Sequence, residues 1–568
     1  MAIERLKKIR LGDLLVEQNA ITEEQLMAAL DAQKSTGNKL GRELIESGYL
    51  TEDQLLGILA EQLNIEFIDI RSYSINPETI KRIPEVQARR FRVIVLAEEP
   101  DHVLIGMADP TNIFAYDEVS RLVEKPLTLA VVKEDDLLKA IDSVYRRTAE
   151  ISNFAAELGQ QISAGESATT ERSTNEGVAD APVVKLLQTM LEDAVQVNAS
   201  DIHIEPEINE LRIRFRIDGT LRVQTTTDHL IAGALISRLK LMSGLDISEK
   251  RLPQDGRFHL DVHGHQIDVR LSTLPLPDGE SAVMRLLNQS AGFLGVDQLG
   301  MPAELATKVR KVAHCPHGLM LVTGPTGSGK TTTLYALLGE LNNPEVKIIT
   351  VEDPVEYRLN GVNQVQVNPK VELTFSKVLR SVLRQDPDVV LIGEMRDKET
   401  IEIGLRASMT GHFVMSTLHT NDAISSALRL IDMGSEPYLI AGALRGILAQ
   451  RLIRRICASC AATETLDAAT KLMLKDMGNE ADDITFKRGN GCRNCNNTGY
   501  QGRIGIYEFL EMDAELVEAL HNGDLIEFSK MAKSRPGFKP LTQSAYELAI
   551  KGITTVDEVI KVGYGMEM

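Results

Sequence analysis

Tryptophan is absent from this sequence of 568 residues, and aromatic residues make up only 4% of it. A long apolar run is absent too, since no stretch approaches the roughly 18 residues that a membrane-spanning helix requires. Residues 1–10 are charged and lead directly into an amphipathic pattern, which is unlike a secretory leader. These absences predict a cytoplasmic protein that meets a membrane only through partners.

Positive charge is in deficit. The chain has 62 basic and 81 acidic residues, which gives a formal net charge of −19. A general nucleic-acid binder needs a basic surface that displaces counterions from phosphates. The charge balance therefore predicts no nucleic-acid partner.

Cysteine is scarce, with five residues in the chain, but four of them form two Cys-x-x-Cys pairs. In a reducing compartment this arrangement favours a metal over a disulfide, and four thiolates suit tetrahedral zinc. A redox pair is the alternative, although two such pairs make it less favoured. Cys315 is left over and is expected to be a buried apolar residue. The predicted zinc ligands are Cys457, Cys460, Cys492 and Cys495.

The length exceeds what one hydrophobic core supports, so several domains are expected. An internal repeat with an offset of 29 positions relates Arg10-Leu11-Gly12 to Lys39-Leu40-Gly41, and each copy predicts two short helices. Residues 159–180 are rich in small and polar residues, as in a flexible linker. The predicted parts are a helical repeat at 1–70, an α/β remainder at 71–147, a linker at 148–180, an α/β domain at 181–295 and a nucleotide domain at 296–568.

A glycine-rich loop follows an apolar strand at 319–323 and opens a helix at 331–341, which is the setting of a phosphate-binding P-loop. Glycines let backbone N–H groups close around phosphates, Lys330 supplies charge to them, and the Thr331 hydroxyl can hold Mg²⁺. The predicted ATP site contains Gly324, Pro325, Thr326, Gly327, Ser328, Gly329, Lys330, Thr331 and Thr332.

Two acidic clusters follow other predicted strands of the same domain, where ligands of parallel sheets bind. Glu394 follows the predicted strand at 389–392 and is a candidate for magnesium and water, with Gly393 where aspartate is common. Glu352 opens the second cluster at 352–356. His419 follows a further strand and could sense the γ-phosphate, although a lone histidine is more often structural. Which glutamate acts as the base stays open.

These features, in this order, resemble the secretion ATPases of type II secretion and type IV pilus assembly over about residues 181–568. The shared segments are the P-loop, the "Asp box" 349–356, Gly393-Glu394, the "His box" 411–422, Gln450-Arg451-Leu452 and the tetracysteine segment 457–495. The resemblance implies an α/β fold class: a RecA-like P-loop NTPase domain, a PAS-like α/β domain, and an N-terminal helical plus α/β regulatory domain. It also implies a homo-hexamer in which Arg270 and Arg285 reach nucleotide.

The N-terminal repeat looks like the cyclic di-GMP-binding domain first recognised in the MSHA pilus ATPase. A two-fold repeat that opens on a cation and a glycine suits a two-fold symmetric phosphate ligand. The residues matched by position are Arg10, Leu11, Gly12, Leu15, Leu30 and Gln33 in the first copy, and Lys39, Leu40, Gly41, Leu44, Leu59 and Gln62 in the second.

The resulting hypothesis is a cytoplasmic ATPase, peripheral at the inner membrane, that uses ATP, Mg²⁺ and Zn²⁺ to drive pilus extension. It would act on an inner-membrane platform protein and respond to cyclic di-GMP. One alternative is a type II secretion ATPase that serves a pseudopilus. An alternative of another class is a cyclic di-GMP-sensing scaffold with vestigial ATPase motifs, which the intact Lys330, Thr331 and Glu394 disfavour.

Overall fold

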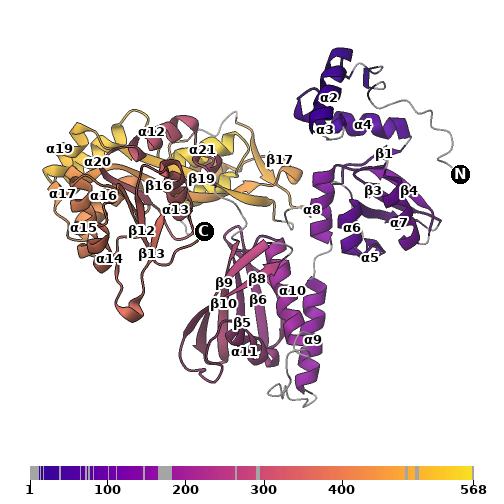
Figure 1. Ribbon diagram of the computed structural model, residues 1–568, viewed down its shortest axis with the longest axis horizontal. Coiled ribbons are helices and arrows are strands. Elements are labelled where there is room, and N and C mark those ends of the chain that lie inside the picture. Colours follow the sequence, from indigo (N-terminus) through magenta and orange to yellow (C-terminus); the bar gives the residue numbers. More distant parts are fainter. Residues whose placement is uncertain are drawn as a thin grey trace. The chain divides into compact units, whose positions relative to one another are not determined.

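The computed structural model forms two compact units, residues 1–147 with the short segment 491–498, and residues 148–490 with 499–568. Figure 1 traces the chain through both. The residues described are 12, 15–16, 18, 20–36, 40–63, 65–70, 73, 77–80, 82–99, 101–110, 112–123, 125–144, 148–163, 182–262, 265–288, 294–479, 484–492, 495 and 498–565. Arg10, Leu11 and Lys39 of the predicted cyclic di-GMP set lie outside them.

The predicted repeat is visible in three helices near the start of the first unit, α2 (Glu23–Thr36), α3 (Leu40–Glu46) and α4 (Glu52–Leu63). Before α2, the Thr22 and Gln25 side chains each bond the other's backbone N–H, at 3.2 and 2.9 Å. Thr51 and Gln54 do the same before α4, at 3.3 and 3.0 Å. This pair of reciprocal caps satisfies the unpaired N–H groups at both helix starts. The spacing of 29 residues is therefore a true structural repeat.

The rest of the first unit is a four-stranded sheet with helices, which agrees with the predicted α/β remainder. The strand order is β1 (Glu66–Phe67), β4 (Leu127–Val131), β3 (Val103–Met107) and β2 (Val93–Glu98), and β2 alone runs antiparallel to its neighbour. Its helices are α5 (Pro77–Ile80), α6 (Glu85–Phe91), α7 (Ile113–Val123) and α8 (Glu134–Val144).

The predicted linker begins too early. Residues assigned to it form helix α9 (Thr148–Ser163), which packs beside α10 (Pro182–Gln196) and β7. Ile151, Ala155 and Leu158 of α9 are buried in the core of the domain that follows. The composition of the predicted linker favours a flexible segment. The apolar residues of α9, however, are spaced so that they form one face of the helix, and this face packs on that core.

The domain predicted at 181–295 has a six-stranded antiparallel sheet of PAS-like type, covered by α9, α10 and α11 (Ala232–Met242). The strand order is β7 (Thr220–Asp228), β6 (Glu210–Ile217), β5 (Asp201–Pro206), β10 (Gly279–Asn288), β9 (His265–Leu276) and β8 (Gln254–Val262). In β6 buried and half-buried residues alternate, as the sequence predicts. One row across the sheet aligns Arg257, Arg270, Arg285 and Asp201, so these side chains share a face.

The RecA-like domain is built on a seven-stranded sheet of order β13-β12-β14-β15-β11-β16-β19, parallel except for its last pair. The strands are β11 (Gly318–Thr323), β12 (Ile348–Glu352), β13 (Asn363–Gln366), β14 (Val389–Ile392), β15 (Phe413–Leu418), β16 (Leu444–Ile456) and β19 (Tyr500–Glu511). Fully buried strands β11, β12, β14 and β15 are the ones predicted from apolar runs.

Helices cover this sheet, and their buried residues lie in three apolar clusters. They are α12 (Ala303–Ala313), α13 (Lys330–Leu341), α14 (Phe375–Val382), α15 (Lys398–Met409), α16 (Ala423–Asp432), α17 (Pro437–Ala443), α19 (Ala514–His521), α20 (Leu525–Ser534), α21 (Leu541–Ile550) and α22 (Val556–Gly563). A small ribbon of β17 (Ala461–Glu464) and β18 (Phe486–Gly489), with α18 (Ala468–Asp476), carries the tetracysteine segment. Among the described residues, every helix is too short or too polar to cross a bilayer.

Candidate nucleotide, metal and regulatory sites

The P-loop lies between β11, an interior strand of the sheet, and helix α13, as predicted. Gly324, Gly327 and Gly329 have φ values of 146°, 78° and 87°, which side-chain-bearing residues rarely adopt. A Cβ at Gly324 would stand 2.3 Å from the Gln450 carbonyl oxygen. Ser328 is 3% exposed, and its hydroxyl oxygen has no hydrogen-bond partner. A buried polar atom in a glycine cradle fits a loop that receives phosphate oxygens.

Lys330 is held by the backbone of the loop that precedes it. Its ammonium donates to the carbonyls of Gly324 and Pro325, both at 2.9 Å. Burial lowers the pKa of Lys330 to about 8, against the opposing attraction of Glu394. The ammonium is therefore charged at neutral pH but has lost much of its contact with water. Pairing with an anion would compensate for that loss.

Gln450 supports the loop, a role that the sequence alone did not assign. Its amide nitrogen donates to the Ser328 carbonyl at 2.7 Å, and its amide oxygen accepts from the Thr333 hydroxyl at 2.8 Å. Gln450 is 2% exposed and lies on β16, beside β11. Its position in the Gln-Arg-Leu segment was the available signal, but nothing local linked that segment to residue 328.

Glu352, a predicted catalytic residue, ends β12 and is only 4% exposed. Its carboxylate accepts hydrogen bonds from the Tyr335 hydroxyl, the Thr350 hydroxyl and the Gln364 amide. Burial and the neighbouring carboxylate raise the pKa of Tyr335, so this phenol remains a donor. Because three protein donors already surround Glu352, its oxygens are poorly placed to take a proton from water.

Glu394 follows β14, and its negative charge attracts the Lys330 ammonium. Its side chain is 12% exposed and pairs with Arg396 at 2.6 Å, while His419 Nε2 lies 3.9 Å from its other oxygen. Burial, then Lys330, lowers the pKa of His419, so the imidazole is neutral at pH 7. The glycine before Glu394 also has a reason: a Cβ at Gly393 would lie 3.1 Å from the Val351 carbonyl oxygen and 3.2 Å from Glu352 Cα.

The two predicted arginines differ in position. Arg270 reaches the end of the Asp box, where it lies 2.8 Å from the Glu356 carboxylate and 3.2 Å from the Val355 carbonyl oxygen. Arg285 pairs instead with Asp201 of its own domain at 2.9 Å, and its side chain is 56% exposed. Of these two arginines, as the described residues place them, Arg270 contacts the nucleotide domain and Arg285 contacts its own domain, and Glu356 is the partner that sequence reasoning did not single out.

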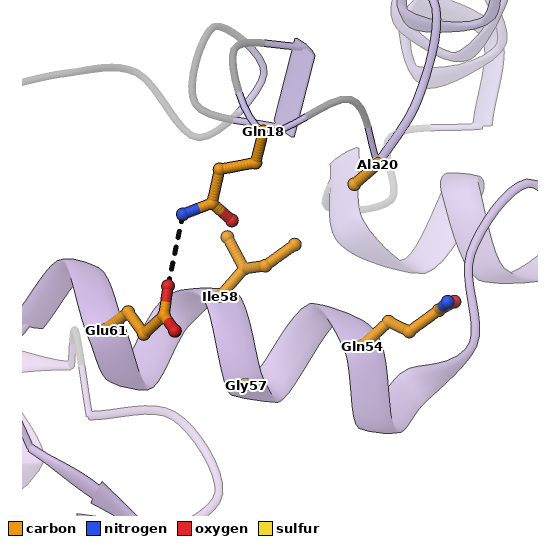
Figure 2. A pocket seen from close by; sticks show the side chains of 6 residues that line it. All are labelled: Gln18, Ala20, Gln54, Gly57, Ile58 and Glu61. Carbon is orange, nitrogen blue, oxygen red and sulfur yellow. Dashed lines mark hydrogen bonds between the residues drawn. The ribbon is translucent and has the colours of Figure 1, made fainter.

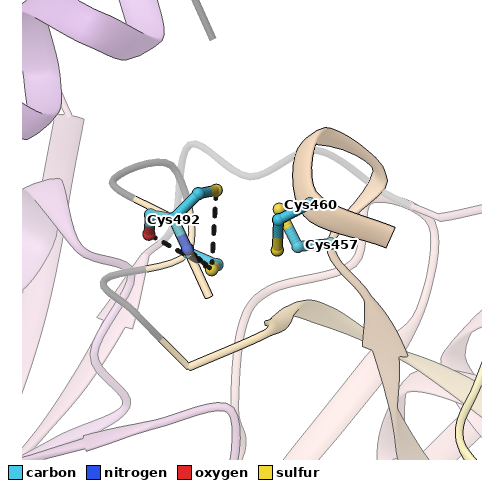
Figure 3. Close-up of side chains that lie close together, drawn as sticks. Cys457, Cys460 and Cys492 are labelled. Carbon is cyan, nitrogen blue, oxygen red and sulfur yellow. Dashed lines mark hydrogen bonds between the residues drawn. The ribbon is translucent and has the colours of Figure 1, made fainter. Parts of the chain in front are cut away.

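The four cysteines gather as the two Cys-x-x-Cys pairs predict, with their sulfur atoms within 4.8 Å of one another. Figure 3 shows Cys457 and Cys460 facing the pair that contains Cys492. The Cys495 sulfur accepts from the Cys492 backbone N–H at 3.2 Å, a bond that favours thiolate. Four convergent sulfurs fit a tetrahedral metal with thiolate ligands. Cys315, expected to be buried, is half-buried.

The described residues of the predicted cyclic di-GMP set divide by exposure. Leu15 and Leu44 are fully buried in the core of the repeat, where they pack among neighbouring apolar side chains. Gly12 and Gly41 are buried too, and a Cβ on them would lie 2.7 Å from Leu26 and 2.8 Å from Leu55. These positions therefore serve helix packing. The remaining members are exposed or half-buried: Leu30, Gln33, Leu40, Leu59 and Gln62.

A shallow pocket of the repeat lies beside α4 (Figure 2). Its lining includes the Gln18 amide, which donates to Glu61 at 3.2 Å. No lining residue belongs to the predicted ligand set, although Gln54 is the repeat partner of Gln25. The lining residues are Gln18, Ala20, Gln54, Gly57, Ile58 and Glu61.

A glycine-rich loop that joins the central strand of a parallel sheet to a helix, with acidic residues at neighbouring strand ends, defines a P-loop nucleoside triphosphatase. The family model described as "Type II/IV secretion system protein" matches residues 176–561, and the model described as "MshEN domain" matches residues 63–151. The latter match covers the α/β part and begins after the helical repeat.

Curated relatives agree over most of the chain. The type IV pilus assembly ATPase PilB of Myxococcus xanthus is 40% identical, covering 97% of this chain and 98% of its own length. The type II secretion system ATPase E of Vibrio cholerae is 41% identical, covering 85% and 97%. Among solved structures, the ATPase DotB of Legionella pneumophila has a TM-score of 0.50 at 22% identity, covering 67% of this chain and 96% of that one. This chain belongs to the type II/IV secretion system protein family and is an ATPase.

Proposed function

We propose that this ATPase works as a homo-hexamer that powers assembly of a type IV pilus of the MSHA kind. The contact between Arg270 and the Asp box carries this proposal, because it joins the PAS-like domain to the edge of the nucleotide site. Motion of the PAS-like domain against the RecA-like domain would then follow the state of the nucleotide. An inner-membrane platform protein would receive that motion, so the ATPase would be cytoplasmic and peripheral at the membrane.

Different residues of the site would bind ATP, bind Mg²⁺ and face the attacking water. The P-loop from Gly324 to Thr332 would hold ATP, with Lys330 on the β- and γ-phosphates. Thr331 and Glu394 would hold Mg²⁺, which neutralises charge that develops on the phosphates during hydrolysis. Glu394 and His419 would face the attacking water. Glu352, with its oxygens already bonded, would position the end of β12.

Hydrolysis by the purified full chain tests this assignment. Replacing Lys330 with alanine removes the charge that pairs with phosphate, so the rate is expected to fall at least about 100-fold. Lys311→Ala is the matched control, because that lysine is exposed and pairs with Glu511. Equal rates in the wild type and Lys330→Ala would refute the proposed site.

The hexamer is tested by measuring the mass of the full chain with ATP by analytical ultracentrifugation. A chain that remains monomeric at all concentrations would contradict the proposed hexamer.

Cyclic di-GMP is the proposed regulator. The doubled cap and glycine pattern supports a ligand with two equivalent halves, and Arg10 and Lys39 open the two copies. Labelled cyclic di-GMP is titrated against the wild type, Arg10→Ala and Lys39→Ala. Each loss of a charge-assisted phosphate contact should weaken binding about tenfold or more. Lys34→Ala is the control, and equal affinity in all four proteins would end the regulatory proposal.

A second candidate is the type II secretion ATPase, because the relatives of both systems match at 40% and 41% identity. Deleting the gene separates the two candidates. Loss of surface pili with normal protein secretion supports the pilus assignment, whereas loss of secretion with normal pili supports the second candidate.

A further inference from the structure

Glu508 is a buried carboxylate in the middle of β19, and it has no role in the site described above. It is 4% exposed and lies in the buried run 505–510 of that strand, between the aromatic residues Tyr507 and Phe509. One of its oxygens accepts from the Ala423 backbone N–H at 2.8 Å, and the other accepts from the Leu541 backbone N–H at 3.2 Å. These donors are the first residues of helices α16 and α21.

The Glu508 side chain thus accepts a hydrogen bond from the first residue of each of two helices. The first N–H groups of a helix have no partner within it, and the helix dipole adds positive potential there. A carboxylate with two acceptor oxygens satisfies one such N–H on each helix. The arrangement ties α16 and α21 to the same point of β19.

Glu508 lies in the same row across the sheet as the residue that precedes the P-loop. Thr323, the last residue before the loop, pairs in register with Ala449, which pairs in turn with Glu508. Residues aligned across neighbouring strands share a face, so Thr323 and Glu508 point toward the same layer. The first turn of α16 spans that row, because Ser426 donates to Thr323 at 3.0 Å while Ala423 donates to Glu508.

The loop just before α16 is the His box. Asp422 caps α16 by accepting from the Ser425 N–H at 2.6 Å, and Arg451 donates to Asn421 at 3.1 Å. His419, three residues before the cap, lies beside Glu394. Any displacement of the first turn of α16 therefore moves the histidine relative to that carboxylate.

We propose that Glu508 is a positioning residue for ATP hydrolysis, which fixes the start of α16 and through it holds His419 against Glu394. Burial raises the pKa of Glu508 to about 7, with Asp422 adding to the rise and the two N–H groups and Arg451 opposing it. The ionised form accepts both N–H groups, and protonation removes one good acceptor. Protonation of Glu508 therefore weakens its hydrogen bonds to the starts of α16 and α21 as the pH falls through about 7.

Steady-state ATP hydrolysis by the full chain between pH 6 and 8.5 tests this role. In Glu508→Gln the amide oxygen accepts one N–H, but the NH₂ group faces the other donor. We expect kcat to fall about tenfold with KM for ATP nearly unchanged, since the P-loop itself is intact. The wild-type rise of kcat through pH 7 should disappear in the variant. Glu511→Gln is the matched control, because Glu511 is a half-buried glutamate on the same strand that pairs with the exposed Lys311.

A double-mutant cycle separates positioning from general destabilisation. If Glu508 acts through His419, then Glu508→Gln should lower kcat far less in a His419→Ala background than in the wild type. Additive effects, or a kcat that falls only with the folded fraction seen by circular dichroism, would overturn the inference. If Glu508→Gln does not fold, the variant Ala423→Pro removes the donor N–H at the first position of the helix, where the proline backbone fits, and is tested in the same cycle. This inference rests on the proposed hydrolysis, and an inactive wild type would refute that proposal instead.

Discussion

At the scale of single residues, burial sets the chemistry of the P-loop lysine. Lys330 is 9% exposed, and its ordinary pKa falls to about 8 because the charged form loses water. The loop carbonyls that accept its hydrogen bonds compensate only in part. The charge that attracts phosphate therefore depends on pH near neutrality.

We predict that ATP affinity falls as pH rises above about 8. A group with a lowered pKa is protonated below that value, and only the ammonium attracts the phosphates, so affinity is greatest below pH 8 and weakens up to about tenfold per pH unit above it. Equilibrium binding of a fluorescent ATP analogue between pH 6.5 and 9.5 measures this. Lys330→Arg stays charged throughout and should lack the decline. A wild-type affinity that is constant over this range would contradict the prediction.

At the scale of elements, two segments show how side chains distant in sequence stabilise local structure. The tetracysteine segment has a small two-stranded ribbon, and although Leu474 and Phe486 are buried in a neighbouring core, a metal is the expected source of stability for the loops that hold the cysteines. Helix α9, by contrast, gains its stability from an apolar face buried on the PAS-like core.

For the tetracysteine segment we predict about one zinc ion per chain in the wild type and loss of that ion in Cys460→Ser. Removing a thiolate should also expose residues 457–499 to proteolysis, because the remaining ligands no longer close the tetrahedron. Metal analysis by mass spectrometry measures the content. Cys315→Ser, a cysteine outside the cluster, should retain the ion. Equal zinc in all three proteins would exclude this site.

For helix α9 we predict that Ile151→Ala lowers the free energy of unfolding of its domain by about 2–5 kcal/mol. Ile151 is fully buried, so the change leaves a cavity between α9 and the core. Urea denaturation measures the loss, and Glu157→Ala, an exposed position on the same helix, should be nearly neutral. A neutral effect of Ile151→Ala would mean that α9 is not docked in solution.

At the scale of the whole molecule, the nucleotide machinery and the repeat belong to different parts of the chain. Arg270, Lys330, Glu394 and Gln450 all lie in the unit that begins at residue 148, whereas the repeat lies in the unit of residues 1–147. Catalysis and ligand response should therefore be separable.

We predict that a chain of residues 148–568 hydrolyses ATP at a rate within about threefold of the full chain without cyclic di-GMP. It should show no response when cyclic di-GMP is added, because it lacks both repeat copies. Steady-state hydrolysis of the two chains, with and without ligand, gives the comparison. A truncated chain that still responds would place the regulatory site elsewhere.

The sequence alone determined the features that depend on short spacing. Short motifs identify the P-loop from Gly324 to Thr331, the two cysteine pairs and the two copies of the 29-residue repeat. Apolar runs located the buried strands. Tertiary structure decided which distant residues meet. It joined Gln450 to Ser328, Arg270 to Glu356 and Glu508 to Ala423, and it turned part of a predicted linker into α9. Such contacts depend on how strands align and helices pack, which local composition does not encode.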